Sequence, residues 1–247
     1  MTAAPSVTGV TLEERRTREG PLRVFWRQRS ALMLVTLLVL LALGAWLNQR
    51  FVGWPIFEVL FTLVMLTTIF RLSIRRRQAL IGVLLGVPSG ISLWLCKLFP
   101  DAGLGQVALA LLTLFLLYSA AMILYYVLRD DTVDMDTLSA AFAVFLLIGF
   151  AWGCIYGLLY IHTPGSFQLV AAVPPPYESG IPAYAPMDLL MYFSFVTLTT
   201  VGYGDIIAAS PLSRGMAMLE MVLGHFYLAV LVARLVGLSI AYTAKQT

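Results

Sequence analysis

Charged residues are scarce in this chain of 247 residues, because Asp, Glu, Lys and Arg together make up only 12% of it. A soluble domain typically carries about 25% charged residues. Apolar residues make up 60% of the chain, and the mean hydropathy is +0.88. So little charge cannot cover a globule in water, which excludes a soluble enzyme, a disordered chain and a collagen-like fibre. The composition predicts an integral membrane protein.

Cysteine and histidine are also rare, with two of each. Cys96 and Cys154 lie far apart within apolar stretches, and neither has a second cysteine or a histidine at the spacing of a zinc site. We therefore expect both to be small buried side chains. Neither histidine is accompanied by a nucleophile or a set of metal ligands, so we expect no enzyme activity, no cofactor and no small-molecule substrate.

The chain contains several long runs of apolar residues. A membrane core of about 30 Å needs about 20 apolar residues in a helix. Runs of this kind predict an all-α membrane protein with six transmembrane helices, at residues 31–47, 54–70, 79–98, 104–128, 138–161 and 213–243. The apolar stretch 189–196 is too short to cross, and the stretch 162–186, rich in proline and glycine, predicts a loop.

The arginines orient these helices. They gather before the first apolar run, after the second and after the fourth, whereas the opposite ends hold few basic residues. Cytoplasmic loops carry the excess of Lys and Arg in membrane proteins. We therefore expect both termini in the cytoplasm and the loop 162–186 outside. The basic segment 1–30 has interleaved apolar residues, which favours a helix on the anionic inner leaflet over nucleic-acid binding.

The most informative stretch is MDLLMYFSFVTLTTVGYGD, residues 187–205. Asp188 suits the first turn of a helix, and about ten residues compatible with a helix follow it. The stretch ends in TTVGYGD, residues 199–205. A dehydrated K⁺ ion needs protein oxygens in place of water, and backbone carbonyls supply them when successive residues face one axis. Such a backbone alternates in hand, and Gly202 and Gly204 reach its left-handed half without a Cβ penalty.

TTVGYGD resembles the pore signature of potassium channels, and the last apolar run resembles the inner helix of small bacterial channels with a two-helix pore. The resemblance implies a K⁺ selectivity filter formed by Thr200, Val201, Gly202, Tyr203 and Gly204. It also implies that Thr199 supports the filter and that Asp205 lies at the outer mouth. One loop cannot surround an ion and the chain contains one filter copy, so we expect a homotetramer in membrane lipid with K⁺ as the permeant ion.

Three further residues follow from the same resemblance. It places Glu220 behind the filter, where a buried carboxylate needs a partner such as Ser194 or Thr197. Gly224 is the candidate hinge of the inner gate, with close helix packing as the alternative. His225 is either a pH sensor or a neutral, hydrogen-bonded side chain. Some family members have an acid at the position of Val196 that braces the Asp at the outer mouth, and its absence argues against inactivation through that pair.

The expected organisation has a basic segment 1–30, a four-helix transmembrane domain 31–136 and a pore domain 137–247. The pore domain comprises an outer helix 138–161, an extracellular loop 162–186, a pore helix 187–198, the filter 199–205 and an inner helix 213–243. The run 104–128 contains no Lys or Arg, whereas voltage sensing needs charge within the membrane field. We therefore expect weak or no voltage dependence.

The gating stimulus and the exact class of transport protein stay open. The acidic linker 130–136 favours helix capping and a solvated turn over a divalent-cation site. A separate regulatory subunit is neither indicated nor excluded. A potassium channel in the cytoplasmic membrane of a prokaryote is the favoured function. The alternatives are a subunit of a K⁺ uptake transporter and a non-conducting regulatory membrane subunit.

Overall fold

The computed structural model describes residues 29–50, 56–72, 76–99, 102–129, 135–169 and 187–244. The helices are α3 (Arg29–Arg50), α4 (Ile56–Leu72), α5 (Arg76–Leu98), α6 (Ala102–Arg129), α7 (Met135–His162), α8 (Met187–Leu198) and α9 (Pro211–Ala244). Two short strands, β1 (Phe167–Leu169) and β2 (Ile206–Ala208), pair in antiparallel fashion. Most of the expected interfacial segment 1–30, most of the loop 162–186 and residues 130–134 of the acidic linker lie outside the described residues.

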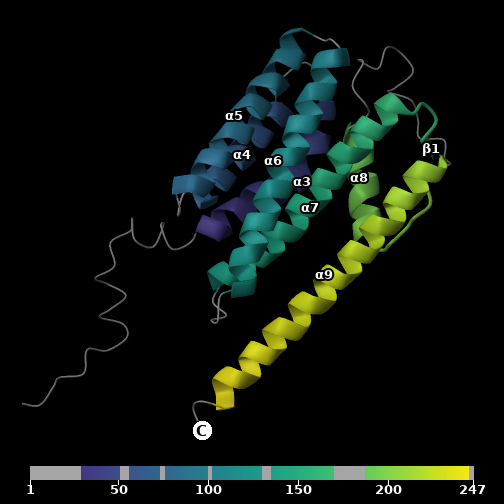
Figure 1. Ribbon diagram of the computed structural model, residues 1–247. Helices are drawn as coiled ribbons and strands as arrows, with labels where there is room; N and C mark the ends of the chain where they lie inside the picture. The colour runs from purple at the N-terminus through teal and green to yellow at the C-terminus, as the bar shows by residue number, and fades with distance from the viewer. Residues whose placement is uncertain are drawn as a thin grey trace, which may run out of the picture.

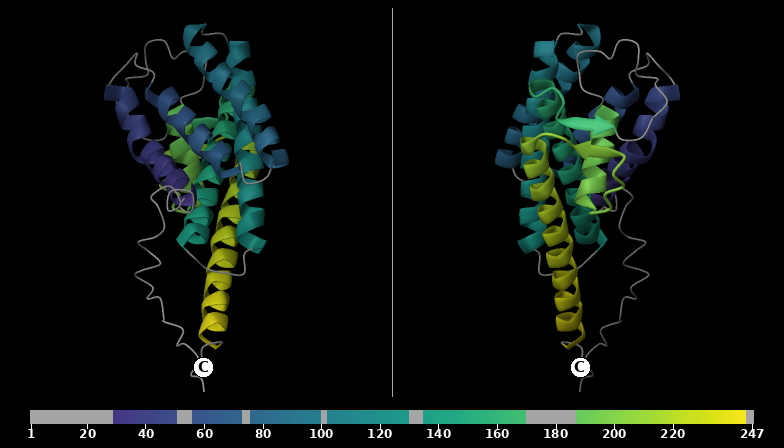
Figure 2. Two further views of the ribbon diagram at one scale, coloured as in Figure 1. Left: turned by 90° about the vertical axis from the view of Figure 1, so that its left-hand side faces the viewer. Right: turned by 90° about the vertical axis from the view of Figure 1, so that its right-hand side faces the viewer.

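Helices α3 to α7 lie side by side as one bundle, and α9 runs along one flank of it (Figure 1). The short helix α8 packs against both α7 and α9. The C-terminal part of α9 extends beyond the ends of the other helices in both side views (Figure 2). We refer to α3–α6 as the four-helix part and to α7–α9 with the two strands, where the sequence predicts a pore domain, as the pore part.

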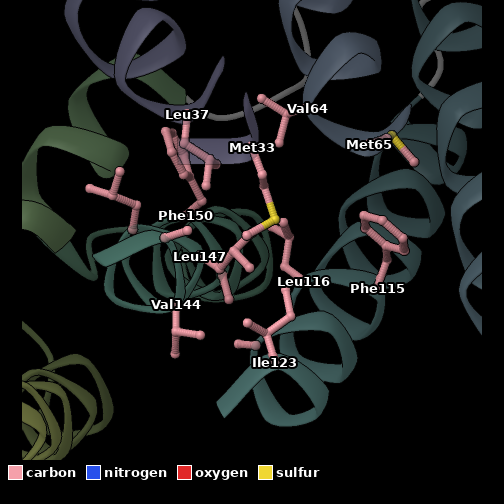
Figure 3. Packing of buried hydrophobic residues seen from close by; sticks show 14 of the residues in the cluster. Met33, Leu37, Val64, Met65, Phe115, Leu116, Ile123, Val144, Leu147 and Phe150 are labelled. Carbon is pink, nitrogen blue, oxygen red and sulfur yellow. The ribbon is translucent and has the colours of Figure 1, made fainter. Parts of the chain in front are cut away.

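The main core lies where the four-helix part meets α7 (Figure 3). It contains Met33 and Leu37 from α3, Val64 and Met65 from α4, Phe115, Leu116 and Ile123 from α6, and Val144, Leu147 and Phe150 from α7. Helix α7 is apolar on all sides and buried along most of its length, as expected of a helix at the centre of a bundle. Phe150 makes edge contacts with Phe61 of α4 at 6.0 Å and with Phe195 of α8 at 5.3 Å between ring centroids. The aromatic contacts thus continue from the four-helix part into the pore part.

In the part of the chain that the structure describes, four helices are long and apolar enough to cross a membrane, within Arg76–Cys96, Gly103–Arg129, Met135–His162 and Pro211–Arg234. Large apolar side chains are exposed along α5 and α9, which suits contact with lipid or with other protein chains. These features indicate an integral membrane protein, as the composition predicts. Cys96 and Cys154 are both buried, which confirms that prediction.

A polar cluster joins three helices at one end of the bundle. The backbone amide and the hydroxyl of Ser30 each donate to the carboxylate of Asp136 at 3.0 Å. Arg71 Nε donates to the Ser30 hydroxyl at 2.6 Å, and Arg71 Nη2 lies 3.6 Å from Asp136 Oδ2. Asp136 therefore satisfies an amide in the first turn of α3, where a carboxylate also favours the helix dipole. The start of α3, the end of α4 and the start of α7 meet here.

Candidate functional site

Helix α8 sits in a groove that glycines of α7 create. Gly149, Gly153 and Gly157 recur every four residues, so they share one face of α7. A Cβ atom at Gly149 would lie 2.5 Å from the Phe195 ring, and one at Gly157 would lie 2.8 Å from Met187 Sδ. A Cβ atom at Gly153 would collide with Met191. Small residues at this spacing let membrane helices approach closely, so the glycines fix the depth of α8. The spacing was visible in the sequence, although our sequence-based interpretation did not use it.

In the loop after α8, the backbone φ angle alternates in sign from one residue to the next. Thr200, Gly202 and Gly204 have φ angles of 59°, 58° and 79°, and Val201 and Tyr203 between them do not have positive φ. The left-handed conformations predicted for the two glycines are therefore confirmed. Thr200 was not predicted to share them, because a β-branched residue rarely adopts a positive φ.

Backbone amides hold this loop to α8. The amide of Thr200 donates to the Thr197 carbonyl at 2.9 Å. The amides of Val201 and Gly202 donate to the Val196 carbonyl at 3.0 and 3.4 Å. These bonds satisfy the amides on the α8 side of the loop and offset the cost of Thr200, which is about 1–3 kcal/mol for such backbone strain.

The side chains of this loop face outward from the chain. Val201 is 52% exposed and Tyr203 is 73% exposed, although both are large and apolar. Neither side chain is therefore braced by packing within one chain. Surfaces of this kind are commonly covered by a partner.

Asp205 is fixed at the end of the loop by two hydrogen bonds. The Tyr192 hydroxyl donates to Asp205 Oδ2 at 2.8 Å, and the Ile206 amide donates to Oδ1 at 3.0 Å. The bond to Asp205 raises the pKa of Tyr192 to about 12, so its phenol stays protonated and continues to donate at neutral pH. Tyr192 lies one helical turn before Val196 and braces Asp205 without an acid at that position. The sequence reasoning missed Tyr192.

The segment that follows Asp205 is attached to the end of α7. Strand β2 pairs with β1, with Phe167 opposite Ala208. Ser210 caps α9, because its hydroxyl accepts the Ser213 amide at 3.1 Å while Pro211 occupies the first helical position. The Ser213 hydroxyl donates to the Ser166 carbonyl at 2.8 Å. This cap starts α9 two residues before the expected position 213.

Glu220 is the central polar group behind the loop. Its side chain is 0% exposed. The Ser194 hydroxyl donates to Oε1 at 2.5 Å, and the Tyr156 hydroxyl donates to Oε2 at 2.5 Å. The Ser194 oxygen also lies 2.8 Å from the Gly149 carbonyl oxygen. These contacts connect α7, α8 and α9 through a single carboxylate.

Ser194 is thus confirmed as a partner of Glu220, whereas Tyr156 was not predicted. Tyr156 lies 64 residues before Glu220, and only its hydroxyl within an otherwise apolar run marked it in the sequence. Its ring packs in edge contacts with Phe167 and Phe193, at centroid distances of 5.4 and 5.1 Å. This packing fixes the direction of the hydroxyl toward Glu220.

Gly224 lies where α9 crosses the end of α8. A Cβ atom there would collide with the Leu198 carbonyl oxygen and would lie 2.9 Å from Leu198 Cδ1. The crossing therefore requires a residue without a side chain, which supports the packing role considered for Gly224. The neighbouring His225 is exposed.

The long apolar helices and this site together define an integral membrane protein in which α7 and α9 flank a short helix and a glycine-containing loop. A family model described as ion channel matches residues 178–239. The matched range includes α8, the loop, β2 and most of α9, and it supports an ion channel function and a non-enzymatic role. No curated protein and no solved structure matches the chain.

Proposed function

We propose that this chain is the subunit of a K⁺-selective channel that conducts K⁺ passively through backbone carbonyls of residues 200–204. The observation that carries the proposal is the alternating hand at Thr200, Gly202 and Gly204, with neighbouring amides bonded to α8. When residues of positive and negative φ alternate, successive carbonyl groups point to the same side of the backbone. Here backbone amides occupy the side that faces α8, so the carbonyls are free to face the other side. A column of carbonyls can replace the water shell of K⁺.

A homotetramer completes the proposed filter. One loop supplies carbonyls from one side only, so an ion surrounded by oxygens needs copies related by symmetry. The exposure of Val201 and Tyr203, and of Met218, Val222 and Phe226 on α9, supports a protein partner on this face. In this arrangement the negative ends of four α8 helices point toward the ion path, and four copies of Asp205 surround the outer mouth, where they attract cations.

The proposed topology has six transmembrane helices with both termini in the cytoplasm. Helices α3 and α4 have 22 and 17 residues, or about 33 and 26 Å of helix, and they pack beside the longer helices. Arg29, Arg71, Arg76, Arg77 and Arg129 stand at helix ends that alternate along the chain, which supports one basic, cytoplasmic end. The proposed location is the cytoplasmic membrane of a prokaryote.

Weak or absent voltage dependence is part of the proposal. Helix α6 has no Lys or Arg before Arg129 at its end. Moving one elementary charge through the membrane field contributes about 2.3 kcal/mol per 100 mV. Without such charges in α6, voltage has little to act on there.

The test is the flux of K⁺ and Na⁺ into liposomes that contain the purified protein. Wild type should pass K⁺ far faster than Na⁺, and Gly202→Ala should abolish selective flux because alanine is strained at φ 58°. Gly215→Ala is the matched control, since no atom lies within 4 Å of a Cβ atom at this helical position. Equal Na⁺ and K⁺ flux in wild type would overturn the proposal. K⁺ uptake that needs an energy source would indicate a transporter, and no flux would indicate a non-conducting subunit.

A further inference from the structure

The half of α9 beyond Gly224 has few polar contacts with the rest of the chain. Many of its large apolar side chains are exposed, and its end extends past the other helices (Figure 2). Among its described side chains, those of Tyr227 and Arg234 donate hydrogen bonds to other helices. The Tyr227 hydroxyl donates to the Ala141 carbonyl of α7 at 2.6 Å. Arg234 Nη1 donates to the Val127 carbonyl of α6.

The Val127 carbonyl is an effective acceptor for a guanidinium group. It is one of the last four carbonyls of α6, which have no amide donor within their own helix. The C-terminal end of a helix also carries partial negative charge, which attracts a cation. Arg234 therefore satisfies an otherwise unpartnered type of backbone group with a charge-assisted bond, which is about twice as strong as a neutral one.

The end of α6 is itself held in place. The Tyr126 hydroxyl donates to the side chain of Gln78 in the first turn of α5. The Tyr118 hydroxyl donates to the Gln78 carbonyl at 3.3 Å. The acceptor of the Arg234 bond therefore belongs to the four-helix part and does not follow α9 freely.

Geometry makes the Arg234 bond sensitive to any bend of α9 at Gly224. Arg234 lies ten residues further along the helix, which is about 15 Å at 1.5 Å per residue. A kink of about 20° would displace it by about 5 Å, which is more than a hydrogen bond can span. Tyr227 is only three residues from Gly224, about 4.5 Å, and the same kink would move it by about 1.5 Å.

We infer that the Arg234–Val127 hydrogen bond tethers the inner helix to the four-helix part and holds α9 straight against bending at Gly224. This inference rests on the proposed channel function, and it adds to that function that bending at Gly224, the candidate hinge of the inner helix, opens the inner gate. Arg234 is a positioning residue in this scheme, because it acts through the helix and not on the ion. The four-helix part thereby restrains the gate although its fourth helix lacks the charges of a voltage sensor.

Single-channel recording in planar bilayers tests the tether. Arg234→Met keeps most of the side-chain length but removes the charge and the donors. We expect the ratio of open to closed time to rise about tenfold, which corresponds to about 1.4 kcal/mol, with unchanged single-channel conductance. Arg234→Lys retains a charged donor and should restore part of the wild-type ratio. Arg129→Met is the matched control for loss of charge at this end, and it should leave the ratio unchanged.

Hydrogen exchange in lipid nanodiscs provides a readout that does not depend on conduction. Arg234→Met should speed the exchange of amides at residues 125–129, and Arg234→Lys should speed it less. If the amides of residues 125–129 exchange at the wild-type rate in Arg234→Met, the tether does not exist. If they exchange faster but the ratio of open to closed time is unchanged or lower, the tether exists but does not restrain the gate. A wild-type protein without K⁺ current would instead contradict the proposed function, and the exchange result would still decide whether the tether exists.

Discussion

Buried hydroxyl groups of the four-helix part and of the pore part differ in how often they link helices. In α4–α6, Thr68, Ser89, Thr113 and Ser119 donate to a carbonyl four residues earlier on their own helix, at 2.6–2.7 Å. The hydroxyls of Thr67 and Thr36, 3.1 Å apart, are an exception that links α4 to α3. In the pore part, the hydroxyls of Tyr156, Ser194 and Tyr227 reach another helix. A bond within one helix satisfies a polar group without fixing a neighbour. A bond between helices fixes their relative position, which the proposed K⁺ filter requires.

The boundary between the two parts shows the same distinction. The apolar contacts of Phe150 hold α7 against α4. The cluster of Ser30, Arg71 and Asp136 at the end of the bundle does so by hydrogen bonds. We conclude that polar links between helices and the close glycine contacts of α7 specify position in this fold, and that apolar packing supplies most of the attachment elsewhere.

Replacing Glu220 should give the largest effect. Glu220→Ala removes the acceptor of both Tyr156 and Ser194 and leaves a cavity between three helices. We expect the free energy of unfolding to fall by about 4 kcal/mol, because the buried Tyr156 hydroxyl loses its acceptor, at about 1–3 kcal/mol, and the cavity adds to this cost, whereas Ser194 can still donate to the Gly149 carbonyl. Chemical unfolding in detergent micelles measures this change.

The comparison with the four-helix part makes the Glu220 prediction specific. Ser119→Ala removes a hydroxyl that is 0% exposed but bonded to its own helix, and we expect a loss of about 0.5 kcal/mol. Glu220→Gln keeps one acceptor oxygen and should cost about 2 kcal/mol. Similar losses for Glu220→Ala and Ser119→Ala would contradict the distinction between the two parts.

A pair of glycines provides the next comparison. Gly224→Ala forces a Cβ atom against backbone atoms of Leu198, which cannot move without shifting α8 and the filter. We expect a loss of about 2–3 kcal/mol in unfolding free energy, together with lower K⁺ selectivity. Gly90→Ala in α5 meets only the end of the Met65 side chain, at 3.9 Å. That change should be neutral or stabilising by up to about 1 kcal/mol, through helix propensity.

Thermal denaturation and K⁺ and Na⁺ flux of both glycine variants would distinguish packing from flexibility at Gly224. If close packing is the reason for glycine, Gly224→Ser should be at least as damaging as Gly224→Ala, because serine is larger. A stable Gly224→Ala protein with normal selectivity would show that α8 and α9 can separate at this crossing without cost.

The helices and the filter string could be predicted from the sequence because their causes are local. A run of about 20 apolar residues is sufficient to predict a membrane helix. Gly202 and Gly204 are marked by the absence of a Cβ atom, and both adopt positive φ. The partner Ser194 could be named because a buried carboxylate requires a donor and few hydroxyls lie on the short helix before the filter.

The contacts that the sequence did not reveal depend on residues far apart in the chain. Tyr156 of α7 reaches Glu220 of α9 across 64 residues of sequence, through a contact that only the packing of these helices brings about. Thr200 adopts a positive φ because amide bonds to α8 outweigh its local preference. The Arg234–Val127 bond spans 107 residues and depends on the crossing angle of α9, which periodicity alone does not specify.

The smallest predicted effect concerns Tyr192, whose hydroxyl bonds to Asp205 at the proposed outer mouth. Its side chain is 39% exposed, so water competes with Asp205 for the hydroxyl. The folded-state pKa of about 12 is higher than the ordinary value of 10. The bond therefore adds its full stability below pH 10, and this stability is lost as the pH rises from 10 toward 12.

Tyr192→Phe should lower the melting temperature by about 1–2 °C at pH 8 and by less at pH 11.5. A difference between wild type and Tyr192→Phe that stays constant from pH 8 to pH 11.5 would show that the phenol proton is not what holds Asp205. In that case the Ile206 amide, at 3.0 Å from the carboxylate, would be sufficient to fix the outer mouth.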